Sequence, residues 1–491
     1  MKKHDLLKAI GIVFLVYVVL SWIIPGGSFS SGSFTKGTIT PLGLGDLFLY
    51  PIATSIYQMF VLSALVVLSI GGLYGVLNKT GVLSSMVGNV VKKFKGHEKL
   101  FIGLTAFFYS LVSVLLNLSL PLFLIIPFSV AILTTLGFDK IKTFLATFGA
   151  IIVGSMATML GFNMDGYNYV NYFLGVKIED TILYSLILFV LVLAVLLFFV
   201  LNGNEKAKSK KSKKNENVVI PLYDAKAKTE KSSTAAVIIF VLLVLVAFVS
   251  MFNWGGIGVD LFDKVYNKIV EFKVNDFAIF AKILGSISAF GYWGNYELIM
   301  LVIIASMLIS WIYNLNVKDS IEAFIDGVKE LVPVAFLVIM ANILLYAVNS
   351  TQTPYFQTIL NAFLNLSEKF NYFAVAGFSA IGSLVYSSYP YLLYAIYDPI
   401  TTNFADSLPI ITITVQAIYG LCSLFVPTSV MLVMGLKYMD ISYKEWFKNS
   451  WKLLLTLLVV ATIAILIITP IVISVIIPRV EAIVKAIAVV I

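Results

Sequence analysis

Small oxygen-bearing side chains lie beside prolines at two places inside long apolar stretches of this 491-residue chain. Asn117 and Ser119 shortly precede one proline, and Ser387 and Ser388 precede another. Proline fits the first turn of a helix, where its missing amide hydrogen is not needed. A helix that begins at such a point presents free N–H groups and a partial positive charge to a bound anion. Unwound carbonyls beside serine and asparagine oxygens also suit a small hard cation. The pattern therefore predicts a site for a carboxylate-bearing molecule together with a cation such as sodium.

Two more apolar stretches are interrupted by residues of the same chemical kind. The candidates are Ser155 and Asn163 in the first half of the chain, and Thr428 and Ser429 near its end. Asp398 adds a carboxylate inside an apolar stretch, where it would contact a proton or a cation. Each serine or threonine has a structural alternative, because such hydroxyls often bond only to the carbonyl four residues back or join two helices. The interruption near the end also fits a plain proline kink. The two proline-containing tips at matching places favour a site.

Composition identifies the class of protein. The chain is 60% hydrophobic and 12% charged, and about 20 apolar residues suffice to span a bilayer, so its long apolar runs are predicted spans. The net charge of +8 comes from lysines between these runs, which favours orientation in a membrane over binding of nucleic acid. His4, His97 and Cys422 are the only histidines and the only cysteine, so a zinc site or a Ser-His-Asp triad inside the membrane lacks its residues. We expect a membrane protein that is not an enzyme.

The two proline-containing tips are predicted to lie in re-entrant helical hairpins. Residues 100–138 are flanked by lysines and break near residue 117, so both of their ends are expected on the lysine-rich inner face. Residues 372–404 break near residue 387 and are expected to enter from the outer face. Irregular backbone at mid-membrane depth is tolerated only where protein or a water-filled cavity covers it. Two such hairpins in the two halves of a chain indicate a transport site near the bilayer midplane.

The expected fold class is an all-α polytopic membrane protein with about nine full spans and two re-entrant hairpins. The predicted spans are residues 7–24, 52–77, 143–160, 181–201, 235–252, 297–313, 331–348, 408–436 and 453–477. Surface helices are predicted at residues 84–99, 317–330 and 353–369. Each half has a span, a surface helix, a hairpin, a broken span and a final span, and the two halves start from opposite faces. The halves are therefore predicted to be inverted repeats.

One polar interruption divides the chain. Residues 1–202 are the first membrane half, residues 203–234 a basic cytoplasmic linker, and residues 235–491 the second membrane half. The lysine-rich stretch at 206–231 has the composition of a disordered tether. The first apolar run is followed by Pro25-Gly26-Gly27 rather than by a cleavage site, so we expect an uncleaved span. The lysine bias places the N-terminus and the linker in the cytoplasm, in a multi-pass protein of the plasma or inner cell membrane.

Several short motifs resemble those of a known family. They lie at residues 24–27 (IPGG), 73–81 (LYGVLNKTG), 137–139 (GFD), 425–429 (FVPTS) and 441–448 (ISYKEWFK). In this order the chain resembles the four-carbon dicarboxylate anaerobic carrier family, in its branch of basic amino-acid (arginine/ornithine-type) antiporters, within the ion transporter superfamily. The most specific part is the proline-threonine-serine that is followed by tyrosine-x-x-tryptophan.

The resemblance implies a scaffold domain and a mobile transport domain, with two hairpin tips that form the site, and often a homodimer. Amino-acid-type members tend to carry acidic residues at the first tip, where this chain has Asn117 and Ser119. The second tip in relatives is rich in serine and glycine, whereas here Ser387 and Ser388 are followed by tyrosine and proline. These differences leave the choice of substrate open.

Together these features predict a secondary active transporter for a small carboxylate-bearing metabolite, an amino acid or a dicarboxylate. Transport would proceed by exchange (antiport) or by sodium-coupled symport, with alternating access. The expected partners are this substrate, the lipid bilayer and a second copy of the chain, and no cofactor is expected apart from a transported sodium ion. An ion or solute channel is one alternative, but a ring of like residues is hard to build from one chain with unlike halves. A non-transporting membrane scaffold is another, and it would leave the interruptions unexplained.

Overall fold

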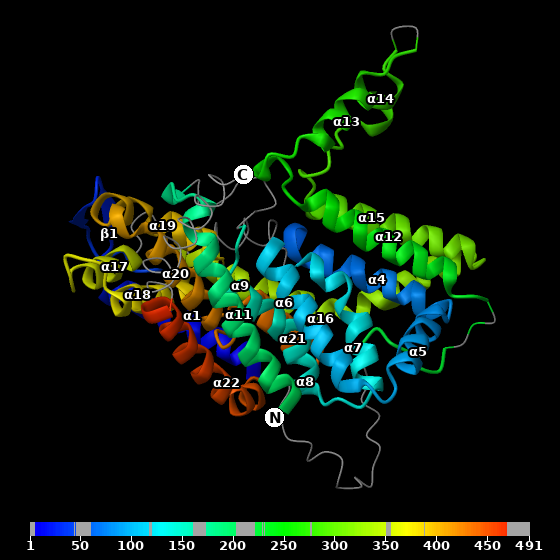
Figure 1. Cartoon of the computed structure of the whole chain (residues 1–491), viewed down its shortest axis with the longest axis horizontal. Coiled ribbons are helices and arrows are strands. Elements are labelled where there is room, and N and C mark those ends of the chain that lie inside the picture. The colour runs from blue at the N-terminus through cyan, green and yellow to red at the C-terminus, as the bar shows by residue number, and fades with distance from the viewer. Residues whose placement is uncertain are drawn as a thin grey trace, which may run out of the picture.

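The chain folds into a bundle of membrane-length helices, from which one helical arm projects (Figure 1). The computed structural model describes residues 5–43, 45, 60–116, 120–160, 173–202, 221–227, 229, 231–274, 277–349, 355–386 and 388–468. Among these residues, seven helices are long and apolar enough to cross a membrane, or eight when the bent pair α4 (Leu65–Lys79) and α5 (Val82–Phe94) counts as one span. The prediction of an all-α polytopic membrane protein is confirmed. The exact number of spans and the repeat arrangement remain predictions.

The described elements follow the chain in two groups. Before the linker they are α1 (Asp5–Ile23), β1 (Gly27–Ser30), β2 (Ser33–Lys36), η1 (Phe60–Ala64), α4, α5, α6 (Glu98–Leu116), η2 (Pro121–Leu124), α7 (Ile126–Thr135), α8 (Lys140–Phe144), η3 (Leu145–Gly149), α9 (Ala150–Ser155) and α11 (Ile178–Asn202). After the linker they are α12 (Thr234–Met251), η4 (Gly255–Ile257), α13 (Leu261–Glu271), α14 (Ile279–Leu284), α15 (Asn295–Ile312), α16 (Val317–Asn349), α17 (Tyr355–Leu364), α18 (Tyr372–Val385), α19 (Tyr389–Asn403), η5 (Ala405–Ser407), α20 (Leu408–Cys422), α21 (Val430–Tyr438), α22 (Tyr443–Ile463) and η6 (Ala464–Ile468). The predicted spans at 7–24, 181–201, 235–252 and 297–313 correspond to α1, α11, α12 and α15 within a few residues.

Helices α4 and α16 are in close contact because glycines face each other. A side chain on Gly327 would place its Cβ 2.0 Å from the carbonyl oxygen of Gly71, and one on Gly75 would lie 2.1 Å from the oxygen of Ala323. Small residues at such spacing let two helix backbones approach within a membrane. Beyond this contact the chain bends by 84° between α4 and α5, at Gly81 with a φ of +72°. The amphipathic helix predicted near this position is thus observed, as α5.

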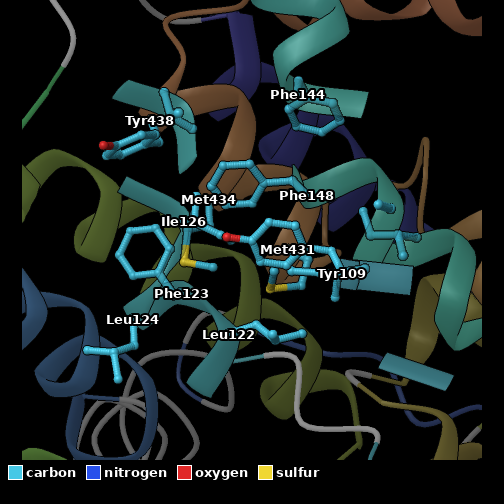
Figure 2. Close-up of a cluster of buried hydrophobic side chains, with 14 of the residues drawn as sticks. Tyr109, Leu122, Phe123, Leu124, Ile126, Phe144, Phe148, Met431, Met434 and Tyr438 are labelled. Carbon is cyan, nitrogen blue, oxygen red and sulfur yellow. The ribbon is translucent and has the colours of Figure 1, made fainter. Parts of the chain in front are cut away.

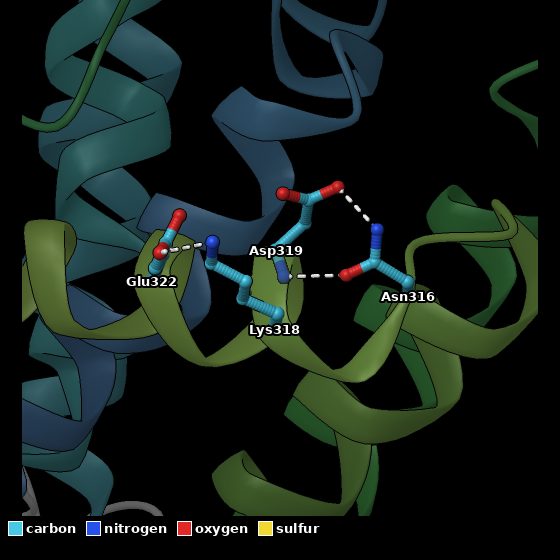
Figure 3. Close-up of polar contacts among 4 residues, drawn as sticks. All are labelled: Asn316, Lys318, Asp319 and Glu322. Atoms are coloured by element: carbon cyan, nitrogen blue, oxygen red, sulfur yellow. Dashed lines mark hydrogen bonds and ion pairs between the residues drawn. The ribbon is translucent and has the colours of Figure 1, made fainter.

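The prediction of two separate elements, a surface helix at 317–330 and a span at 331–348, is wrong. They form the single 33-residue helix α16, which continues through Pro333. Asn316 fixes its start, since its side-chain oxygen accepts from the amide of Asp319 at 2.8 Å and its amide donates to the Asp319 carboxylate at 2.7 Å (Figure 3). The first half of α16 packs on α4 through its small residues, and this contact holds it in line with the second half. Composition alone did not reveal that contact.

The basic linker is ordered where it meets the bundle, so the prediction of a disordered tether is wrong for its described end, residues 221–227. Leu222 is 1% exposed, and its amide donates to the carboxylate of Glu330 at 2.6 Å. The side chain of Asn78 donates to the carbonyl of Leu222 and accepts from the amide of Asp224. Burial of an apolar side chain and these bonds offset the conformational entropy that a tether would keep.

Buried side chains among the described residues form three clusters, of which two are large. The smaller of these two lies among α1, α17, α18, α19 and α20. The larger one includes the contact between η2, η3 and α21 that Figure 2 shows. There the ring of Phe123 lies 6.1 Å from that of Phe148 and 5.8 Å from that of Tyr438, measured between ring centroids. Since η2 is wholly buried, the chain that follows the first tip is packed among apolar side chains.

Candidate functional site

The two helix interruptions predicted in the second half of the chain are present. Helix α20 ends at Cys422 and α21 begins at Val430, with Ser429 in an extended conformation between them. Helix α18 ends at Val385 and α19 begins at Tyr389, with extended backbone at Tyr386 and Ser388. A proline lies in the first turn of α19, as the sequence pattern predicted. Both interruptions therefore place a new helix start inside the bundle.

Side chains of α22 fix the interruption between α20 and α21. The indole Nε1 of Trp446 donates to the carbonyl of Leu424 at 2.7 Å. The hydroxyl of Tyr443 donates to the carbonyl of Phe425. These carbonyls lie beyond the end of α20, in a segment without regular helix, where backbone acceptors need partners from elsewhere. The tyrosine-x-x-tryptophan motif therefore satisfies the unwound backbone next to the proline-threonine-serine motif.

Thr428 is different, because its hydroxyl is buried and unpaired. The residue is 2% exposed, and its Oγ1 has no hydrogen-bond partner among the described residues. It immediately precedes Ser429, the N-cap residue of α21, whose side chain makes no capping bond. The amides in the first turn of α21 have no acceptor within the helix. An unpaired hydroxyl and free amides thus meet at the positive end of a helix, which is suited to an anion.

The depth of this helix start fits a site inside the membrane. Helix α21 has nine residues and is therefore about 14 Å long at 1.5 Å per residue. The hydrocarbon core of a bilayer is about 30 Å thick. If the end of α21 lies at one face of the core, its start lies close to mid-depth.

The end of α9 lies against α20 and is held by polar side chains that sequence reasoning missed. The carbonyl of Thr158 accepts from Gln416 Nε2 at 3.0 Å and from Ser185 Oγ at 3.3 Å. Gly420 allows the contact, since a Cβ there would lie 2.8 Å from the Cα of Met156. Gln416 is the only amide side chain in α20, and this polar residue within an apolar helix was the available signal. The helix ends at Ser155, before the break predicted near residue 161.

Four predicted site residues, Asn117, Ser119, Asn163 and Ser387, lie outside the described residues. Among the predicted site residues that the structure describes, Ser155 donates its hydroxyl to the carbonyl of Ile152, three residues back, at 2.7 Å. A bond to the preceding helical turn is the structural role that such a hydroxyl often has.

Ser388 is partly exposed at the start of α19. The hydroxyl of Tyr419 on α20 donates to the carbonyl of Tyr386, at 3.1 Å. This bond ties the described flank of the second tip to the same helix that contacts α9. Helix α20 therefore connects both regions with the interruption at Thr428.

Asp398 has a partner in the hairpin of β1 and β2. Its Oδ2 accepts from the amide of Gly32 at 3.0 Å, and Asn403 of the same helix donates to the Gly32 carbonyl at 2.9 Å. The β1–β2 turn has positive φ at both Ser31 and Gly32, which is typical of a tight two-residue hairpin. Asp398 thus positions this turn, and this pairing favours a structural role over the predicted contact with a proton or a cation, which stays a prediction.

One cavity lies among the described ends of α17, α18, α19 and α20. It is a small, open hollow of only about 10 Å³, lined by residues that include Phe363, Asn371 and Phe404. None of the predicted site residues lines it. This cavity therefore does not extend the site at Thr428.

Comparison with known families places the chain in one of them. The model of the C4-dicarboxylate anaerobic carriers (DcuC) matches residues 4–470. The chain belongs to this carrier family. The carrier is thus a multi-pass membrane transporter and not an enzyme, and the family that its motifs resemble is confirmed. The sequence has no match among curated proteins.

Two solved transporters are similar to the carrier over most of its length. The YdaH transporter of Alcanivorax borkumensis, described as having an unusual topology, is 15% identical with a TM-score of 0.42, covering 94% of this chain and 97% of that one. MtrF of Neisseria gonorrhoeae, described as illuminating a class of antimetabolite efflux pumps, is 13% identical with a TM-score of 0.41, covering 94% of each chain.

Proposed function

We propose that this carrier is a secondary active transporter of a small carboxylate-bearing metabolite, a dicarboxylate or an amino acid. It works by exchange or by sodium-coupled alternating access, and it binds the substrate carboxylate at the interruption between α20 and α21. The observation that carries this proposal is the buried hydroxyl of Thr428 beside the start of α21, which has no hydrogen-bond partner among the described residues.

Hydrogen-bond energies favour a carboxylate at Thr428. A buried hydroxyl without a partner costs about 1–3 kcal/mol, and a bound carboxylate would remove that cost. A substrate carboxylate would accept from the Thr428 hydroxyl and from the free amides of α21. Hydrogen bonds to charged groups contribute about 1.5–3 kcal/mol each, which helps to offset the loss of water around the carboxylate.

The other predicted contacts complete the proposed site. Ser429 and Ser388 are the N-cap residues immediately before α21 and α19, so both lie at helix starts that the interruptions create. Asn117, Ser119, Ser155, Asn163 and Ser387 remain proposed contacts for substrate or sodium. The tie between Tyr419 and Tyr386 keeps the second tip near α20, which supports a shared site.

The lengths of α18 and α19 support a re-entrant hairpin at residues 372–404. With 14 and 15 residues they measure about 21 and 23 Å, which is shorter than the roughly 30 Å core. The first proposed hairpin is less symmetric, because α6 has 19 residues and is itself long enough to cross. We therefore propose a test by labelling: a cysteine at Lys140 reacts only from the inside and one at Asn403 only from the outside. The opposite reaction at either position rules out that hairpin.

The proposal also includes the membrane location, the orientation and the oligomeric state of the carrier. The carrier lies in the plasma or inner cell membrane with its N-terminus and linker in the cytoplasm, because the lysines gather on that side. It functions as a homodimer. Chemical cross-linking in membranes tests the dimer independently of transport.

Uptake into proteoliposomes tests the function. The purified carrier is reconstituted with an imposed sodium gradient, or with substrate inside for exchange, and is offered labelled four-carbon dicarboxylates, arginine, ornithine and neutral amino acids. We expect saturable, gradient-dependent uptake of at least one of these. Absence of gradient-dependent flux for every tested carboxylate contradicts the proposal, and currents far above carrier turnover indicate a channel instead.

A further inference from the structure

A helical arm formed by α13 and α14 stands apart from the bundle (Figure 1). It belongs to the segment between α12 and α15. Since α12 follows the linker that we propose to be cytoplasmic, this segment is expected on the outer face. No residue of α13 or of α14 is buried. The arm is therefore not held by packing on the bundle, and it takes no part in the site at Thr428.

Helix α13 has an apolar stripe that nothing in the described chain covers. Leu261, Val265 and Ile269 follow one another at a spacing of four residues and are 57%, 46% and 40% exposed. Residues at this spacing lie on one face of a helix. Lys264 and Lys268 border the stripe, and Lys264 also contacts the carboxylate of Asp260 at 2.6 Å. An apolar face edged by lysines on a short polar helix is typical of a helix that lies in a membrane interface.

The apolar surface continues beyond α13. Phe272 follows the helix and is 51% exposed, and its ring centroid lies 5.6 Å from that of Phe280 in α14. Phe280 and Ile283 are 42% and 70% exposed. Single exposed apolar residues are ordinary, but a contiguous row of them marks a surface that binds something.

The base of the arm carries the aromatic residues that are typical of a membrane boundary. Trp254 lies 4.7 Å from Phe252 and 5.0 Å from Phe262, and Trp293 lies 5.0 Å from Phe290, between ring centroids. These rings occur where α12 ends and α15 begins. Tryptophan is enriched where a span leaves the hydrocarbon core.

The arm joins two candidate membrane spans whose outward surface is apolar. Helices α12 and α15 are both candidate spans, and their apolar side chains point outward, for example Leu242 at 54% and Met307 at 67% exposed. We propose that the α13–α14 arm lies on the outer surface of the bilayer, with its apolar stripe at the boundary of the acyl chains and its lysines at the lipid phosphates. The arm thereby anchors the α12–α15 pair in the membrane.

Fluorescent probes on the full-length carrier in phospholipid nanodiscs test this placement. One variant carries the probe at Val265→Cys, a second at Ile283→Cys, and the control at Asn267→Cys, which lies about 200° around the helix from Val265. The native Cys422 is buried, and unlabelled wild-type protein serves as the blank. All three positions are exposed and lie in the arm, so the substitutions leave the bundle intact.

We expect probes at 265 and 283 to emit at shorter wavelength and to be quenched several-fold more by nitroxide-labelled lipid than the probe at 267. Iodide in the water should quench the control most strongly. Equal iodide quenching at 265 and 267 without lipid quenching overturns the proposal, because the arm then projects into water. Protection of position 265 from both quenchers also overturns it, because a protein surface such as a second copy then covers the stripe.

Discussion

Two helix starts inside the bundle follow similar sequences but have different hydrogen-bonding states. After the first tip, η2 begins at Pro121 and is fully buried, and the hydroxyl of Tyr74 donates to the carbonyl of Leu124 and accepts from the amide of Phe128. After the last interruption, α21 begins next to Thr428, whose buried hydroxyl has no partner among the described residues. A proline near a break therefore marks a helix start. Whether the polar groups at that start already have hydrogen-bond partners distinguishes a start that only packs from one that can bind a ligand.

The largest expected effect on stability comes from removing the side chain that holds the second start in place. Trp446 is fully buried, its ring lies 4.5 Å from that of Phe144, and its indole pairs with the Leu424 carbonyl. We expect Trp446→Ala to lower the free energy of unfolding by about 3–5 kcal/mol, the usual range for a buried tryptophan. Thermal unfolding in detergent measures it. Trp451→Ala on the same helix, at a position 48% exposed, is the matched control and should unfold near the wild-type temperature.

A smaller loss is expected at the first start. Tyr74→Phe removes the hydroxyl that pairs with two backbone groups, so we expect a loss of about 1–3 kcal/mol in unfolding free energy. Uptake per folded molecule should stay at the wild-type level, and Tyr397→Phe, at an exposed tyrosine, should change neither quantity. If Tyr74→Phe abolishes uptake while the protein remains folded, the η2 backbone itself contributes to binding, in addition to the proposed contacts of Asn117 and Ser119 before it, and the contrast between the two starts is lost.

The smallest effect is expected at the acidic candidate. Asp398→Asn keeps an oxygen that accepts from the amide of Gly32. We therefore expect the free energy of unfolding to change by less than about 1 kcal/mol, and the sodium dependence of uptake to stay unaltered. The measurement is the initial rate of uptake against sodium concentration. A lost or shifted sodium dependence instead assigns Asp398 to cation binding, as its position in an apolar stretch predicted.

The sequence was sufficient for features that are local in the chain. Apolar length predicted α1, α11, α12 and α15, and proline beside serine or threonine predicted the interruptions before α19 and α21. Contacts between residues far apart in the chain could not be predicted in this way. Leu222 bonds to Glu330 across 108 residues, and Gln416 bonds to Thr158 across 258 residues. The continuity of α16 likewise depends on its packing against α4. The unpaired state of Thr428 is of the same kind, since it depends on what surrounds the side chain.

The most direct test of the account is Thr428→Val in proteoliposomes, compared with Thr412→Val. Both threonines are buried, but the hydroxyl of Thr412 already donates to the carbonyl of Leu408 at 2.7 Å. Losing a hydrogen bond to a charged group corresponds to about 1.5–3 kcal/mol, so Thr428→Val should reduce the efficiency of uptake by roughly tenfold or more without lowering the unfolding temperature. Thr412→Val should retain uptake. If both variants transport equally well, the start of α21 does not bind the substrate.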